Sequence, residues 1–96
     1  MPRQLLMMPV IVQGVDDLIA PQGDPQAMVV RDFSHRGLCL VYEQPFKHVR
    51  VAVMLTFPEE GTILAAEVRW SKELGPFYQL GCEVVGKLTA FPGLEE

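Results

Sequence analysis

Alternation of apolar and polar residues dominates this chain and predicts strands rather than helices. The clearest case is the segment 49–57, in which one face consists of large apolar residues. These are Val49, Val51, Val53, Leu55 and Phe57, which alternate with Arg50, Ala52, Met54 and Thr56. Successive side chains of a strand point to opposite faces, so a period of two predicts a half-buried β-strand.

Other segments carry the same kind of signal. They are Met7–Gln13, Ala27–Arg31, Leu38–Tyr42, Thr62–Trp70 and Phe77–Val85. The fourth of them groups Leu64, Ala66, Val68 and Trp70 on one face, and the fifth groups Leu80, Cys82 and Val84. No stretch of ten residues has the periodicity of an amphipathic helix.

Residues typical of turns separate these runs. Gly14–Gln26 is predicted to be a loop, Pro58–Gly61 a hairpin turn, and Ser71–Pro76 another loop. The tail from Gly86 to Glu96 holds at most a short helical turn. The pattern indicates an all-β fold, either a sandwich or a small six-stranded antiparallel β-barrel. The barrel is favoured because closure removes exposed strand edges.

Length and composition place this fold in a single domain covering residues 1–96. No apolar run approaches the ~20 residues that span a membrane, and the N-terminus lacks the long apolar region of a signal peptide. We therefore expect a cytoplasmic protein without membrane insertion. Cys39 and Cys82 lie inside apolar stretches and lack metal-binding spacing, so we expect buried free thiols.

The charge is unevenly distributed. The formal net charge of −4 argues against a general nucleic-acid binder, and the few aromatic residues argue against a small barrel that stacks nucleic-acid bases. The segment 31–50 is nevertheless basic. It contains Arg31, Arg36, Lys47 and Arg50, together with His35 and His48. This segment is either a solvated face or a local anion site.

Patterns that would indicate catalysis or metal binding are absent from the sequence. The two histidines have no zinc-binding spacing, and no nucleophile elbow or phosphate loop occurs. Glu59 and Glu60 lie in a predicted turn, where paired acids are usually solvated. We therefore expect neither an enzyme, nor a catalytic residue, nor a metal site, nor a cofactor.

The polar segment Arg31–Gly37 is the main candidate for function. Asp and Ser side chains bond nearby backbone N–H groups, and glycine at position 37 can adopt a positive φ, so the segment could simply be a turn. The same residue types also suit a guanine. A carboxylate accepts from the N1–H and N2–H₂ groups, and arginine bonds O6 and N7. Asp32, Ser34 and the flanking Arg31 and Arg36 supply this chemistry.

The segment Asp32–Gly37, "DFSHRG", also resembles the [D/N]-x-S-x-x-G motif of the PilZ family. The later runs are similar to the strands of that family, including "AEVRW" ending at Trp70 and "YQLGCEVV" with Gly81. The resemblance covers about Arg3 to Val85. It implies a PilZ-like split barrel and a receptor for the bacterial messenger cyclic di-GMP that acts as an adaptor for a protein partner.

The resemblance also implies roles for individual residues. Arg3 lies six residues before Pro9 and is similar to the second arginine of the family's R-x-x-x-R clamp, while its partner would fall before Met1. Arg3 would contact a guanine or phosphate, Asp32 and Ser34 would hold a guanine edge, and Trp70 would pack near the ligand. With one clamp arginine in the sequence, two functions stay open: a receptor for cyclic di-GMP, or a degenerate PilZ domain that acts by protein contacts alone.

Overall fold

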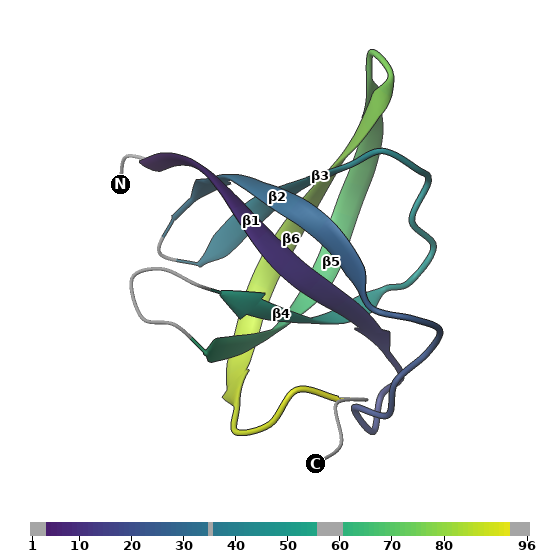
Figure 1. The fold of residues 1–96 in the computed structure, drawn as a ribbon, viewed down its shortest axis with the longest axis vertical. Helices are drawn as coiled ribbons and strands as arrows, with labels where there is room; N and C mark the ends of the chain where they lie inside the picture. Colours follow the sequence, from purple (N-terminus) through teal and green to yellow (C-terminus); the bar gives the residue numbers. More distant parts are fainter. Residues whose placement is uncertain (1–3, 35, 56–60, 93–96) are drawn as a thin grey trace.

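Six β-strands make up the fold in the computed structural model, which describes residues 4–34, 36–55 and 61–92. The strands are β1 (Gln4–Val15), β2 (Gln26–Phe33), β3 (Gly37–Tyr42), β4 (Arg50–Leu55), β5 (Thr62–Leu74) and β6 (Phe77–Leu88). Every predicted strand is present, and most are longer than the alternation indicated. β1 and β5 cross the molecule almost from end to end (Figure 1).

The strands close into an antiparallel barrel in the order β1-β2-β3-β6-β5-β4. Closure comes from the second half of β1, where residues 11–15 pair with residues 50–54 of β4. The predicted six-stranded antiparallel barrel is therefore confirmed, and the sandwich alternative is wrong. Closure also brings β6 between β3 and β5, so that strands distant in sequence become neighbours.

The barrel interior is filled by aliphatic side chains from all six strands. Its most buried members are Val12, Val30, Leu38, Leu40, Val51, Val53 and Leu80. The inward faces predicted for β4 and β6 are confirmed. The buried residues on these faces are Val51, Val53, Leu55, Leu80 and Cys82. Val49 is an exception, because it precedes β4 and is 66% exposed, and Phe57 lies outside the described residues.

A second, smaller apolar cluster lies on the outside of the barrel. Phe91, in the tail after β6, is only 5% exposed and packs with Val15, Ala52 and Ile63. Ala52 was predicted on the more polar face of its strand, yet it is fully buried because the tail covers that face. Within the described residues, the tail contains bends and a turn but no helix.

A β-bulge in β5 determines where Trp70 lies. Val68 pairs with Cys82 and Trp70 with Gly81, so Arg69 is an extra residue on β5. An extra residue shifts the alternation of side chains by one position. Trp70 therefore leaves the inward face shared by Ala66 and Val68 and is 48% exposed. The prediction that it shares their face is wrong for this reason.

The hairpin formed by β5 and β6 extends well beyond the barrel (Figure 1). Residues 71–74 were predicted to be a loop, but they continue β5, and Gly75 and Pro76 form a tight two-residue turn. The register with β4 ends at Glu67. Among the described residues, Trp70–Leu74 therefore pair with β6 only, and this segment of β5 has an open edge.

The loop between β1 and β2 is held by buried and exposed polar contacts. Gln13 is 1% exposed, and its side-chain Nε2 donates to the carbonyls of Gln22 and Gly23 at 3.2 and 3.0 Å. Asp16 Oδ1 accepts from the backbone N–H groups of Leu18 and Ala20, both at 2.9 Å. The predicted loop is confirmed for residues 16–25, whereas Gly14 and Gln26 belong to β1 and β2. The backbone of the loop is held by the Asp16 carboxylate and by the buried amide of Gln13.

Candidate functional site

The motif residues Asp32–Gly37 connect β2 to β3 at one corner of the barrel. The backbone N–H of Ser34 donates to the carbonyl of Gly37 at 2.8 Å, and the Ser34 hydroxyl lies 3.5 Å from the same oxygen. The carbonyl of Arg36 accepts from the backbone N–H of Val84 at 2.9 Å. Hydrogen bonds from Ser34 to Gly37 therefore close the corner, and the bond from Val84 to Arg36 joins it to β6.

Gly37 is required at this corner for a reason other than a left-handed backbone. Glycine can adopt a positive φ, but the φ of Gly37 does not lie in the left-handed region. Instead, a Cβ at this position would lie 2.6 Å from the backbone oxygen of Cys82. The glycine lets β3 approach β6 closely, and the neighbour it accommodates is the protein's own backbone.

Motif residues that are far apart in sequence meet around one surface depression of about 280 Å³. The corner contributes Ser34, Arg36 and Gly37, and β5 contributes Trp70. The remaining lining residues are Leu38, Gly81, Cys82 and Glu83. The depression thus combines an aromatic ring, a guanidinium, a hydroxyl and a carboxylate, which is a set suited to a small polar ligand.

Trp70 forms one wall of this depression by lying against Gly81. A Cβ at position 81 would be 2.1 Å from Cε2 of the indole, so only glycine leaves room for the ring. The Nζ atom of Lys72 lies 5.7 Å from the ring centroid, within cation–π range. Two features therefore favour this placement of the indole while almost half of its surface is left open to solvent.

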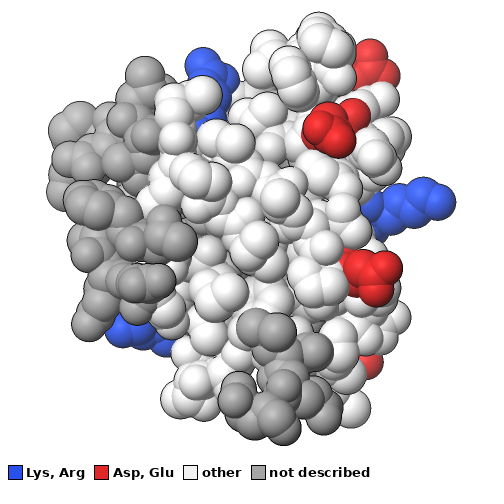
Figure 2. Space-filling view, in the orientation of Figure 1, with Lys and Arg blue, Asp and Glu red and all other residues white. Residues whose placement is uncertain are grey.

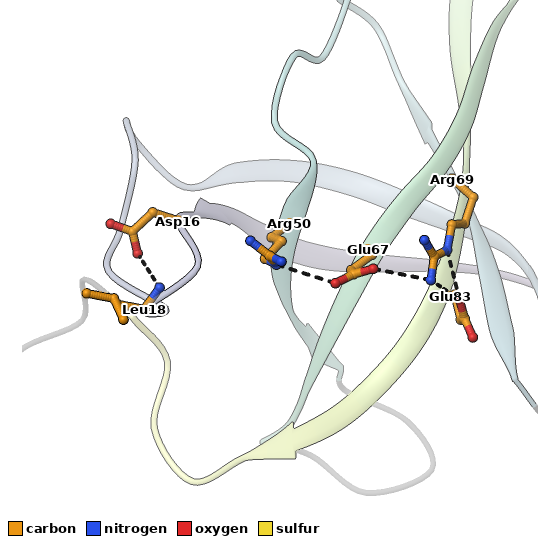
Figure 3. Close-up of polar contacts among 6 residues, drawn as sticks. All are labelled: Asp16, Leu18, Arg50, Glu67, Arg69 and Glu83. Atoms are coloured by element: carbon orange, nitrogen blue, oxygen red, sulfur yellow. Dashed lines mark hydrogen bonds and ion pairs between the residues drawn. The ribbon is translucent and has the colours of Figure 1, made fainter.

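A chain of ion pairs crosses the outside of the barrel next to the depression (Figure 3). Glu67 on β5 bonds Arg50 on β4 at 3.4 Å and Arg69 at 3.2 Å. Arg69 also bonds Glu83 on β6, with Nε donating to Oε1 at 2.8 Å. The hydrogen bond to Glu83, followed by the charges of Glu83 and Glu67, raises the pKa of Arg69. Glu83 therefore lines the depression, and the guanidinium of Arg69 balances its negative charge.

Two other predicted site residues, Arg31 and Asp32, lie in β2 next to the corner. Arg31 is the extra residue of a bulge in β2 and is exposed. Asp32 pairs with Cys39 and Leu5 and is half-buried. Neither is among the described residues that line the depression. Arg3, like His35, lies outside the described residues, so its predicted role stays a prediction.

The basic residues of the segment 31–50 do not form one site. Arg50 is engaged with Glu67. Lys47 and His48 line a separate depression with Gln26 and Tyr42, where the His48 ring packs against Gly14. Within the described residues, this leaves Arg31 and Arg36 as the basic side chains near the corner.

A larger depression of about 390 Å³ lies over β1, β2 and β4, and its lining is apolar. It is lined by Pro9, Val10, Ile11, Ala27, Met54, Leu55 and Gly61. Figure 2 shows that the described charged side chains lie around the margin of this face of the molecule, with an uncharged centre. The described residues that line it offer no hydrogen-bonding side chain to an anionic nucleotide, so the smaller polar depression is the better candidate site.

Cys39 and Cys82 are both buried and form no disulfide, as predicted. Burial, with a smaller contribution from the charge of Cys39, raises the pKa of Cys82 to about 12. Although Cys82 lines the depression, its thiol is therefore protonated at neutral pH. A protonated thiol is a poor nucleophile, so Cys82 supplies packing here and not reactivity.

Two charged residues at the site, Arg69 and Glu83, were not predicted from the sequence. Their contact depends on the bulge and on the pairing of β5 with β6. The described residues contain no cluster of three or more potential metal ligands and no helix long and apolar enough to cross a membrane.

Fold and site together define a small antiparallel β-barrel with a polar, aromatic-walled depression at one corner. No protein-family model, no curated protein and no solved structure matches this chain. Membership of the PilZ family therefore stays a prediction from the motifs.

Proposed function

We propose that this chain is a PilZ-type adaptor that binds cyclic di-GMP and passes its ligand state to a protein partner. The observation that supports the proposal is the meeting of two motifs of the resemblance. Ser34 and Gly37 of "DFSHRG" share a depression with Trp70, which ends "AEVRW" on another strand. Such a receptor acts in the bacterial cytoplasm and catalyses no reaction.

Each motif residue has a role in this proposal. Arg36 at the rim and Arg31 nearby supply positive charge for the phosphates, and Asp32 accepts from a guanine edge. Gln4 pairs with Phe33, so β1 begins beside the corner, and Arg3 is the residue that precedes Gln4. In this proposal Arg3 is the clamp residue, as the resemblance implies.

Isothermal titration with cyclic di-GMP tests this proposal. At about 100 μM protein, a dissociation constant in the tens of micromolar still produces measurable heat. Asp32→Ala and Arg3→Ala should each weaken binding by about 5- to 150-fold, the range for one lost bidentate contact. Asp24→Ala is the matched control, because Asp24 is an exposed acid in the loop between β1 and β2. Absence of heat from the folded wild-type protein would overturn the proposal.

A degenerate PilZ domain without a nucleotide is the second candidate, and one observation favours it. Ser34 closes the corner through hydrogen bonds to Gly37, and Gly37 accommodates the backbone of Cys82. Both residues are therefore needed by the fold even when no ligand binds. Capture of the same protein partner with and without cyclic di-GMP, together with a melting temperature that the nucleotide does not change, is the result this alternative predicts.

A further inference from the structure

We propose that Glu83 reads the N1–H and N2–H₂ edge of a guanine base that stacks on Trp70, with Arg69 as a positioning residue. This inference rests on the proposed binding of cyclic di-GMP, which carries two guanines. Asp32, which does not line the depression, is proposed for one of them, and Glu83 is assigned here to the other, which stacks on Trp70. It starts from the composition of the depression, which brings a carboxylate and an open aromatic face together across neighbouring strands.

The size of the depression favours one base over a whole dinucleotide. Its volume of about 280 Å³ is at the lower end of the range of small-molecule sites. Trp70 supplies a stacking surface, because its ring rests against Gly81 and is 48% exposed. Stacking on an aromatic side chain accepts any base, so it provides affinity without selecting guanine.

Selection comes from the carboxylate of Glu83. An ionised carboxylate only accepts hydrogen bonds, and guanine presents two adjacent donors, N1–H and N2–H₂. Adenine presents an acceptor, N1, at the corresponding position, and an acceptor facing a carboxylate is unfavourable. Glu83 therefore favours guanine over adenine at the place where the base would stack.

Arg69 holds the reading group in place. Both of its contacts to Glu83 are made to Oε1, so Oε2 retains its capacity to accept from a ligand. Arg69 is itself held by Glu67, which belongs to the same ion-pair chain but does not line the depression (Figure 3). The positive charge of Arg69 also offsets the repulsion that a lone carboxylate would exert on a nucleotide phosphate.

Titration of variants with cyclic di-GMP, cyclic di-AMP and GMP tests the inference. Glu83→Gln should weaken the binding of cyclic di-GMP by about 5- to 150-fold and reduce the preference for guanine over adenine, because the contact between the carboxylate and the two base donors is lost. Glu73→Gln is the matched control. It removes the same charge from an exposed position of β5 that does not line the depression, so it should leave the affinity close to that of the wild type. Near-UV circular dichroism checks that both variants fold.

The outcomes separate this inference from the proposed function. Cyclic di-GMP binding that Glu83→Gln leaves unchanged, or that both variants weaken equally, overturns the inference and leaves the proposed function standing. Binding of GMP without cyclic di-GMP, weakened by Glu83→Gln, overturns the proposed function and supports the base-reading role. Absence of binding to either guanine nucleotide overturns both.

Discussion

Gly37 and Cys82 approach each other so closely that a Cβ on Gly37 would lie 2.6 Å from the carbonyl oxygen of Cys82. Both partners belong to paired strands, β3 and β6, so neither can move without disturbing the ladder. The same contact forms one side of the candidate site. A motif glycine is thus explained by barrel closure before any ligand is considered.

Gly37→Ala should therefore destabilise the protein by about 1–3 kcal/mol, the usual cost of overpacking a close contact. Urea denaturation followed by circular dichroism measures the change. Gly86→Ala is the control, because a Cβ at position 86 of β6 meets nothing within 4 Å. Equal stability of the two variants would contradict the structural role of Gly37.

Gly81→Ala should behave differently, because the atoms it displaces belong to a half-exposed side chain. The new Cβ would overlap the indole of Trp70, and the ring can swing toward solvent. We expect a red shift of the tryptophan emission with a smaller loss of stability than in Gly37→Ala. Trp70 is the single tryptophan of the sequence, so fluorescence reports on this ring alone. An unchanged emission spectrum would show that the ring does not rest on Gly81.

Gln13→Leu should loosen the loop between β1 and β2. The side chain is buried, and its amide is a donor to the carbonyls of Gly14, Gln22 and Gly23. Loss of a buried donor costs about 1–3 kcal/mol when the acceptors are left unsatisfied. Faster hydrogen exchange over residues 16–25 and a lower urea midpoint are the expected results. Gln22→Ala, at an exposed position in the same loop, should leave both measurements close to wild type.

The thiol of Cys82 should resist alkylation in the folded protein. Its pKa of about 12 leaves very little thiolate at pH 8, and burial restricts access. We expect iodoacetamide to modify Cys82 slowly in buffer and quickly in concentrated urea, which unfolds the protein. Rapid modification of Cys82 under native conditions, located by mass spectrometry, would contradict this environment.

The same pKa implies a dependence of stability on alkaline pH. The folded state holds the proton up to a pKa of about 12, whereas the unfolded thiol loses it near 9.0. The contribution of Cys82 is therefore complete below pH 9 and is lost as pH rises toward 12, by at most about 1.4 kcal/mol per pH unit. Cys82→Ala should flatten the alkaline slope of the unfolding free energy relative to wild type.

Local alternation was sufficient to predict the strands, because each strand carries its period of two in its own residues. It failed where the partner strand decides the outcome. Ala66 and Val68 face inward as predicted, but Trp70 does not, because the bulge at Arg69 depends on the pairing with β6. The length of β5 was also underestimated. Its last residues are polar and resemble a loop in sequence, but their pairing with β6 makes them part of the strand.

The site was predictable in part for a similar reason. Ser34, Arg36 and Gly37 are contiguous in sequence, and they do lie at one depression. Glu83 is more than forty residues away, and nothing local indicates that closure of the barrel brings β6 beside the corner. Contacts of this kind follow from the register of strands distant in sequence, which alternation alone does not determine.

The open edge of β5 has a consequence for the behaviour of the protein in concentrated solution. Unpaired strand edges invite pairing between molecules, which can lead to aggregation. If two molecules paired antiparallel about Lys72, their two ammonium groups would lie directly opposite each other, and like charges in that position are destabilising. We therefore expect Lys72 to disfavour self-association in this register. Light scattering at rising concentration should show more association for Lys72→Val than for the wild type.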